Sequence, residues 1–418
     1  MKPGGRPTDA GVASSSGRAG RWASVDWAMT SGEHVISRQC PACRCAVPAA
    51  MFCGQCGAGL TATATARDLF LRPRVFAAAP REPVAVPRIT SSLFPRLPAS
   101  ARKPFRLALV LLLGAMVALS ALGANAALGA ITILGGPLLF VLYMWQSDAF
   151  RDISRRALVI AFLTGSTLGV AWWLFTGRLL AGSYGVSTAA GLALQNLLAG
   201  FGLAVTVGGA LILVLPPAVV RLLRVPVHEP LDGYVIGAFG ALSYGCAASI
   251  TWLFPQIVAG LLDAQSSWRM FTDAITYGVI DPLTTAALGG LLGLALWFRP
   301  SGRHSRQART VVTICAVLMA VLFVGIWVVD ALSLPHAVEV AANLVQAGVA
   351  LVLLRVAVQT VLLHETPDPA TGDAVLCVHC EKVVPDAPFC VSCGAAARAS
   401  SRSSRRLRRQ CPPVPEFT

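Results

Sequence analysis

Charged side chains are scarce in this chain. They make up 13% of its 418 residues, whereas hydrophobic residues make up 55%, and the mean hydropathy is +0.65. Soluble globular domains carry about 25% charged residues. The shortage therefore excludes a soluble protein of ordinary composition. Long apolar runs recur between Phe105 and Leu363, which is typical of a polytopic helical membrane protein.

Alternation of apolar and polar residues is lacking within these runs, so a transmembrane barrel is excluded. We predict an all-α polytopic membrane protein with about eight transmembrane helices. Hydropathy places the spans at 105–123, 127–145, 157–175, 190–216, 231–254, 274–298, 311–333 and 337–363. Small-residue spacings within the spans predict close helix packing: Gly165 with Gly169, Gly289 with Gly293, and the run Gly237, Gly240 and Gly245.

Cysteines are few outside two short stretches, CPACRCAVPAAMFCGQCG and CVHCEKVVPDAPFCVSCG. Both stretches read C-x2-C, nine residues, C-x2-C-G. Paired cysteines in the cytosol favour metal binding over disulfides. The predicted ligands are Cys40, Cys43, Cys53 and Cys56 in the first stretch and Cys377, Cys380, Cys390 and Cys393 in the second.

Both stretches resemble the zinc-ribbon family. An aromatic residue, Phe52 or Phe389, precedes the third cysteine, and a glycine follows the fourth. The resemblance implies two structural zinc ions, one in each stretch. A site closed by four cysteines leaves no open position for a substrate, so neither site is expected to be catalytic.

Acidic residues are also few: the chain has 20, against 34 basic residues, which gives a net charge of +14. The basic residues gather in alternate loops. They lie before span one (Arg102, Lys103, Arg106) and after spans two (Arg151, Arg155, Arg156), four (Arg221, Arg224) and six (Arg299, Arg303, Arg306, Arg309). The positive-inside rule makes these loops cytosolic, and an even number of spans then places both termini on that side.

A secretory signal is lacking before the first apolar run, and the Arg- and Ala-rich composition indicates a high-GC bacterial genome. We therefore predict a multi-pass protein of the bacterial cytoplasmic membrane with both termini cytosolic. The predicted segments are a disordered N-terminus (1–38), a zinc ribbon (39–60), a Pro/Ala/Arg-rich linker (61–104), the membrane domain (105–363), a short linker (364–376), a second zinc ribbon (377–396) and a basic disordered tail (397–418).

Three stretches, PPAVVRLLR, EPLDGYVIGAFGALSYGCAASITWLF and GVIDPLTTAALGGLLGLALWF, resemble the PrsW family of intramembrane proteases. The family's Asp-Gly helix is matched by Asp232, Gly233 and Gly237. The order and spacing of the elements agree over most of 105–363. The resemblance implies a core of about eight spans and proteolysis within the membrane.

Acidic residues are missing where that family places its reactive groups. Val220 and Arg221 stand in place of the paired glutamates, and Arg224 takes the Lys position. Ala248 stands where an acid is expected, and Asp281 stands in the His position. Activation of water needs acids or metal ligands. We therefore predict no catalytic residue and a degenerate, non-catalytic core.

Polar and ionisable groups that remain within the spans are costly to bury and normally functional. Asp281, His336, Glu339 and Asn343 are candidates for a polar cavity between spans six and eight. The alternative is that they make interhelical hydrogen bonds or lie near the interface. Arg355 lies deep in span eight and is expected to pair or to snorkel.

Three functions stay open. The first is a binding, regulatory or scaffold protein whose ribbons recruit a cytosolic or membrane protein partner. The second is an active intramembrane peptidase with an altered site built from Asp281, His336 and Glu339. The third is a transporter or channel, for which we find no internal repeat in the core. Beyond the lipid bilayer itself, nucleic acid is a possible but not favoured partner, because anionic lipid suits the RSSRRLRR tail better.

Overall fold

The computed structural model describes residues 37–60, 75–187, 199–258, 267–302, 304–332 and 335–413. Eight of its helical stretches are long and apolar enough to cross a membrane. Two small Cys-rich β-hairpin modules accompany them. The predicted fold class is therefore confirmed: the chain is a multi-pass helical membrane protein with a four-cysteine module near each end.

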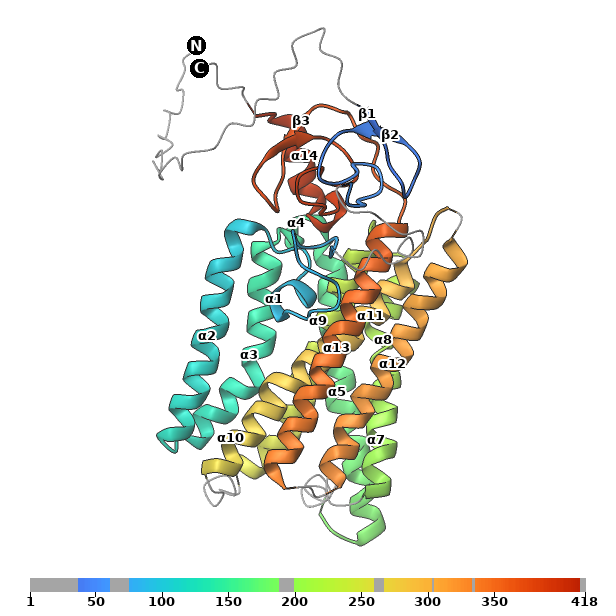
Figure 1. Ribbon diagram of the computed structural model, residues 1–418. Coiled ribbons are helices and arrows are strands. Elements are labelled where there is room, and N and C mark those ends of the chain that lie inside the picture. Colours follow the sequence, from blue (N-terminus) through green and yellow to red (C-terminus); the bar gives the residue numbers. More distant parts are fainter. Residues whose placement is uncertain are drawn as a thin grey trace, which may run out of the picture. The chain divides into compact units, whose positions relative to one another are not determined.

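The eight spans follow one another along the chain, and shorter helices lie before, between and after them (Figure 1). The spans are α2 (Ala99–Ala121), α3 (Asn125–Gln146), α5 (Arg155–Tyr184), α7 (Ala199–Ile212) with α8 (Leu215–Leu222), α9 (Pro230–Val258), α10 (Ser267–Ile275) with the π-helix η3 (Thr276–Ile280) and α11 (Asp281–Trp297), α12 (Ser305–Ala331) and α13 (His336–His364). The short helices are α1 (Ile89–Ser92), α4 (Ala149–Asp152), η4 (Ala397–Ala399) and α14 (Arg402–Gln410).

The fourth span ends later than predicted, at Leu222. Pro216 and Pro217 lie in the first turn of α8. Proline is tolerated there because the first N–H groups of a helix have no helical partner. The two prolines therefore begin a new helix instead of ending the span.

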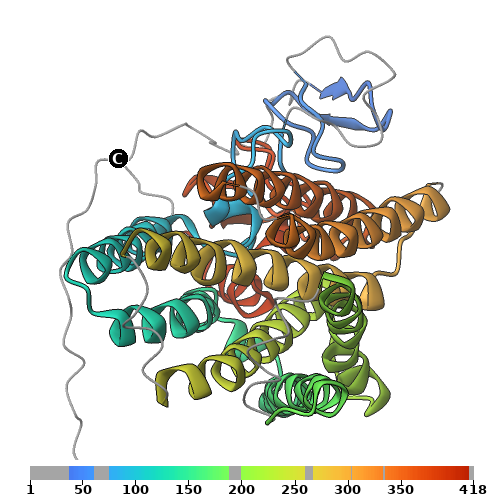
Figure 2. The ribbon, with the colours of Figure 1, turned by 90° about the horizontal axis from the view of Figure 1, so that it is seen from below.

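Glycines lie at close helix contacts, as their spacing predicted, except Gly245, where an added Cβ would meet only Thr285 at 3.8 Å. Helix α9 packs on both α5 and α11. A Cβ atom on Gly237 of α9 would lie 2.1 Å from the carbonyl oxygen of Gly289 in α11, and one on Gly165 of α5 would lie 2.2 Å from that of Gly240. Larger residues would force these backbones apart. In the end view, α12 and α13, in orange, lie side by side (Figure 2).

Residues 75–98 belong to the segment that composition predicted to be a linker, yet they are folded against the bundle. Phe76, Phe94 and Leu97 are buried. The Tyr234 hydroxyl of α9 donates to the Leu93 carbonyl at 2.7 Å. Two features hold this segment in place. Apolar side chains that lie among its prolines pack on α9 and α13, and side chains of the spans form hydrogen bonds with its backbone groups.

The C-terminal segment also differs from its prediction as a disordered tail, because residues 397–410 form η4 and α14. Asp152 at the end of α4 accepts from the backbone N–H groups of Arg402 and Ser403, the latter at 2.9 Å. A carboxylate at a helix N-terminus satisfies free donors and complements the helix dipole. The predicted disorder of 1–38 falls almost wholly outside the described residues.

The two hairpin modules have the same topology. In the N-ribbon (residues 37–60), β1 (Ser37–Gln39) pairs antiparallel with β2 (Ala46–Pro48). In the C-ribbon (residues 374–396), β3 (Ala374–Leu376) pairs in the same register with β4 (Val383–Pro385). The identical cysteine spacing therefore produces the same hairpin twice.

Loops predicted to share one side of the membrane converge on the C-terminal segment. The loop after span two supplies Asp152 to α14, and the loop after span four supplies Glu229 to Arg405. After span six, Ser301 donates its N–H to the His364 carbonyl at 2.9 Å. An even number of spans requires this shared side.

Candidate metal centres and the ion-pair cluster beside them

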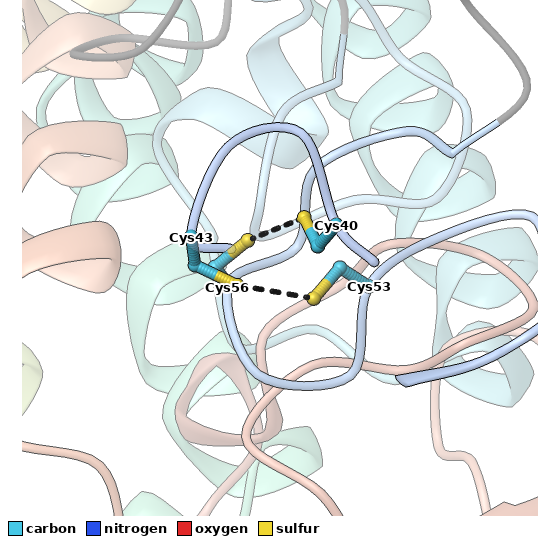
Figure 3. A group of neighbouring side chains, drawn as sticks. All are labelled: Cys40, Cys43, Cys53 and Cys56. Carbon is cyan, nitrogen blue, oxygen red and sulfur yellow. Dashed lines mark hydrogen bonds between the residues drawn. The ribbon is translucent and has the colours of Figure 1, made fainter. Parts of the chain in front are cut away.

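The four cysteines of the N-ribbon point at one another (Figure 3). The Sγ atoms of Cys40 and Cys56 are 3.6 Å apart, and those of Cys43 and Cys53 are 3.8 Å apart. All four sulfurs lie within 4.8 Å of one another. None of these cysteines forms a disulfide.

The C-ribbon repeats this arrangement. The Sγ atoms of Cys377 and Cys393 are 3.9 Å apart, as are those of Cys380 and Cys390. A tetrahedral zinc ion with Zn–S bonds of about 2.3 Å sets its sulfurs about 3.8 Å apart. A disulfide needs about 2.05 Å. Both predicted ligand sets are therefore brought together, and each could hold a metal ion such as zinc.

Local backbone geometry places the sulfurs. Gly57 follows the second knuckle with φ of +71° and donates its N–H to the Cys53 carbonyl at 2.7 Å. Glycine accepts this left-handed conformation without steric cost. A hydrogen bond from Cys56, and backbone N–H groups of Cys56 and Gln55, lower the pKa of Cys53 to about 5 although burial opposes this. A thiolate is the form that binds metal.

The two ribbons pack against each other with an approximate two-fold relation. The Phe52 N–H donates to the Val391 carbonyl at 3.0 Å, and the equivalent Phe389 N–H donates to the Gly54 carbonyl at 2.9 Å. A Cβ on Gly57 would lie 2.7 Å from the Phe389 ring, and one on Gly394 would lie 2.9 Å from the Phe52 ring. The phenylalanine of each motif thus packs against the glycine of the motif in the other ribbon.

The C-ribbon also contacts the membrane domain directly. The Ala396 N–H donates to the Ala77 carbonyl at 2.7 Å. His379, inside the knuckle, is 5% exposed, and its Nδ1 lies 3.5 Å from the Arg102 guanidinium at the start of α2. Burial, with a contribution from Arg102, lowers the pKa of His379 to about 4. This histidine is therefore neutral at pH 7, and it is no member of the metal-binding group.

A buried ion-pair cluster lies where the ribbons meet the spans. Arg96, whose side chain is fully buried, binds Asp232 at 2.6 Å and Glu229 at 2.9 Å. Glu229 also pairs with Arg405 of α14. Burial alone would lower the pKa of Arg96, but Asp232 and Glu229 raise it above its ordinary value. Asp232, near the start of α9, is thus paired with an arginine from residues 75–98.

The cluster extends into the segment after α13. Arg405 lies 3.0 Å from Asp368, and Arg398 pairs with Asp368 at 2.7 Å and with Glu365. Burial raises the pKa of Glu365 to about 7 against the effect of Arg398. Burial also acts to raise the pKa of Asp368, but Arg405 and Arg398 hold it below its usual value. The two acids differ because Asp368 is more exposed and faces two arginines.

Arg355 in α13 forms a second buried centre. Its guanidinium donates to Ser91 at 2.8 Å, to the Pro83 carbonyl at 2.9 Å and to Glu82 at 3.4 Å, and it lies 4.0 Å from the centre of the Phe76 ring. The prediction that Arg355 pairs is therefore confirmed. The partners of Arg355 come from residues 75–98, so this side chain holds that segment against the eighth span.

The four candidates for an intramembrane cavity are described unequally. Asp281 begins α11 and lines a small cavity with residues of α3, α9 and η3, and none of its described lining residues belongs to α13. Asn343 is fully buried and Glu339 is half-buried in α13. The side chain of His336 lies outside the described residues. A cavity shared by all four residues stays a prediction.

The buried ion-pair cluster was not predicted from the sequence. Glu229 and Asp232 stood in the quoted EPLDG stretch, where two acids at a span boundary were a usable signal. Arg96 gave no signal, because one arginine in an Arg- and Pro-rich segment looks like its neighbours.

Comparison with protein-family models, with curated proteins and with solved structures gives no match to this chain. Its function is therefore argued from its own geometry.

Proposed function

We propose that this chain is a non-enzymatic membrane protein in which the two zinc-loaded ribbons form one cytosolic module that binds a protein partner. The observation that carries the proposal is the reciprocal packing of the ribbons, Phe52 on Gly394 and Phe389 on Gly57. Ends of the chain separated by more than three hundred residues thus build a single body. The basic loops favour the cytosolic side for this body.

The surface of the ribbon pair is asymmetric, which favours one binding face. Leu376 and Val383 lie opposite each other on the C-ribbon hairpin and are 43% and 41% exposed. The equivalent cross-strand pair of the N-ribbon is Gln39 and Ala46. Exposed apolar pairs on small modules suit protein contacts. The C-ribbon hairpin is therefore the proposed contact face.

A structural role for the core fits its chemistry. Both metal centres are closed by four cysteines, which leaves no ligand position for water or substrate. Glu229 and Asp232, the acids at the PrsW-like motif, are neutralised by Arg96 and Arg405. Both carboxylates are thus occupied by arginines of the same chain. We infer a PrsW-like, non-catalytic core that serves as the membrane scaffold of the module.

The arginines of the RSSRRLRR tail support protein over nucleic acid as the partner. Arg405 pairs with Glu229 and Asp368, Arg409 pairs with Asp386 at 2.7 Å, and Arg408 donates to the Leu376 carbonyl at 3.1 Å. Nucleic-acid binding draws its affinity from cations that are free to meet phosphates. Most of this basic helix is already committed to intramolecular acids and carbonyls.

Quantitative crosslinking in cells, followed by purification of the full-length protein, tests the proposal. The variant Leu376→Asp/Val383→Lys should lose at least tenfold of its crosslinked partner. The matched control Gln39→Asp/Ala46→Lys, at the equivalent positions of the N-ribbon, should retain it. Both variants should keep two zinc ions per chain. Equal recovery of the same proteins with both variants would contradict the assignment of this contact face.

A further inference from the structure

Asp281 lies at mid-membrane beside a cavity. Counted along the helix, it is about 15 Å from the start of the Phe271–Trp297 span and about 24 Å from its end. The cavity that it lines has a volume of about 20 Å³. Its polar lining residues come from three spans: Thr132 of α3, Cys246 and Ser249 of α9, and Tyr277 and Thr285 of the sixth span.

The helix changes its hydrogen-bonding pattern at this carboxylate. Residues Thr276–Ile280 form a π-helix, and the N–H of Asp281 donates to the Thr276 carbonyl, five residues back. Pro282 follows and supplies no N–H to the preceding turn. Short π-helical turns inside longer helices occur frequently at functional sites. Irregular backbone at membrane depth is tolerated where it lines a cavity, which is the case here.

No basic residue neutralises Asp281 among the described residues of the cavity wall. The polar contact that it receives is from the Thr285 hydroxyl, at 3.4 Å. An isolated carboxylate in hydrocarbon is strongly disfavoured, so it is neutralised either by a proton or by a bound cation. A proton needs no cavity and no additional oxygens. A cation needs both, and this cavity is lined by four residues that carry hydroxyl groups.

The size of the cavity limits the ligand. A cavity of about 10–15 Å³ is the least that holds one water molecule, so 20 Å³ admits one water-sized ligand and excludes an amine side chain or a peptide. Hydroxyl and carboxylate oxygens are hard ligands that suit hard cations. One carboxylate matches a single positive charge. A carboxylate oxygen is a ligand of high field strength, which favours the smaller Na⁺ over K⁺.

We propose that Asp281, with the hydroxyls of Thr132, Ser249, Tyr277 and Thr285, forms an intramembrane Na⁺ site between α3, α9 and the sixth span. The site is independent of the ribbon module. Its occupation stabilises the contact between three spans that meet at the π-helix. A ligand that binds the folded state alone raises thermal stability by mass action.

Thermal unfolding of the full-length protein in detergent tests the site directly. Titration with NaCl against choline chloride at constant ionic strength should give a saturable rise in Tm that KCl reproduces weakly. The variant Asp281→Asn should abolish the rise. The matched control Asp148→Asn, whose side chain is 45% exposed, should keep it.

Two further variants test the site even if Asp281→Asn does not fold. Thr285→Val and Ser249→Ala should fold and shift the Na⁺ midpoint at least tenfold upward. Equal effects of NaCl and choline chloride on the wild type would overturn the proposal. So would a Na⁺-dependent rise that survives in Asp281→Asn. A stability that changes with pH identically in both salts would assign the site to a proton alone.

Discussion

The two ribbons share one spacing and one hairpin, but they are held in the structure very differently. Two backbone hydrogen bonds join the N-ribbon to the C-ribbon, from the Phe52 N–H to the Val391 carbonyl and from the Phe389 N–H to the Gly54 carbonyl. The C-ribbon is tied to residues 75–98 through Ala77, to α2 through Ala99, and to α14 through Leu376 and Asp386. Two identical motifs therefore take different places because their surroundings differ: the N-ribbon is peripheral, and the C-ribbon anchors the pair.

The largest effect is expected from removing a metal ligand of the anchoring ribbon. Cys390→Ser should lose one zinc ion and release both ribbons and α14, because apparent zinc-binding energies of about 10–16 kcal/mol supply the folding energy of such modules. Cys53→Ser should also lose one zinc ion but expose only the N-ribbon. Zinc content and limited proteolysis with mass spectrometry measure the two outcomes. The asymmetry is disproved if both variants give the same cleavage map.

Removing the central arginine should have the next largest effect. Arg96→Leu leaves Asp232 buried without its ion-pair partner and Glu229 with Arg405 alone, which costs about 3–5 kcal/mol. Arg88→Leu is the control, because Arg88 is 54% exposed in its pair with Glu82 and such pairs contribute up to about 1 kcal/mol. Thermal or denaturant unfolding in detergent compares them. A smaller loss of stability for Arg96→Leu than for Arg88→Leu would contradict the buried cluster.

Disrupting the contact between the ribbons should come third. Phe52→Ala empties the contact with Gly394 and should cost up to about 3 kcal/mol of pairing energy. Hydrogen exchange should then increase in β1 and β2 and stay unchanged in β3 and β4. Zinc content should remain at two ions per chain. Faster exchange in all four strands would show that the C-ribbon depends on the N-ribbon, contrary to the comparison.

Acidification should have the smallest effect. Arg405 and Arg398 lower the pKa of Asp368, so the folded state holds this carboxylate more favourably than the unfolded state. The contribution is fully present above the unfolded pKa of about 4 and is lost as the pH falls through the lower folded value. For this partly exposed acid it should amount to at most about 1 kcal/mol.

The control for acidification is Asp368→Asn, which removes the titrating group. The wild type should lose its advantage over this variant as the pH falls below about 4. Unfolding in detergent measured from pH 3 to pH 7 checks the difference. An advantage that persists undiminished at pH 3 would show that the pairs with Arg405 and Arg398 do not depend on the charge of Asp368.

Patterns that repeat over short distances were predictable. The spans follow from apolar length, and the glycine contacts of Gly165 and Gly289 follow from their spacing. The cysteine ligand sets follow from their knuckle spacing, because two C-x2-C turns joined by a hairpin have few ways to present four thiolates. The folding of residues 75–98 was not predictable, because its stability comes from Arg355 and Gln359, which lie far away in the chain.

Short-range patterns were enough to predict the class of this protein, the approximate positions of its spans and eight candidate metal ligands, because hydrophobic length and local chelating geometry depend on near neighbours alone. The pairing of the ribbons, the contact of α14 with Asp152 and the contacts of Arg96 with Glu229 and Asp232 arise only when the chain folds. The physical reason is that a buried charge is stable only beside its partner. That partner can lie anywhere in the chain, and folding selects it.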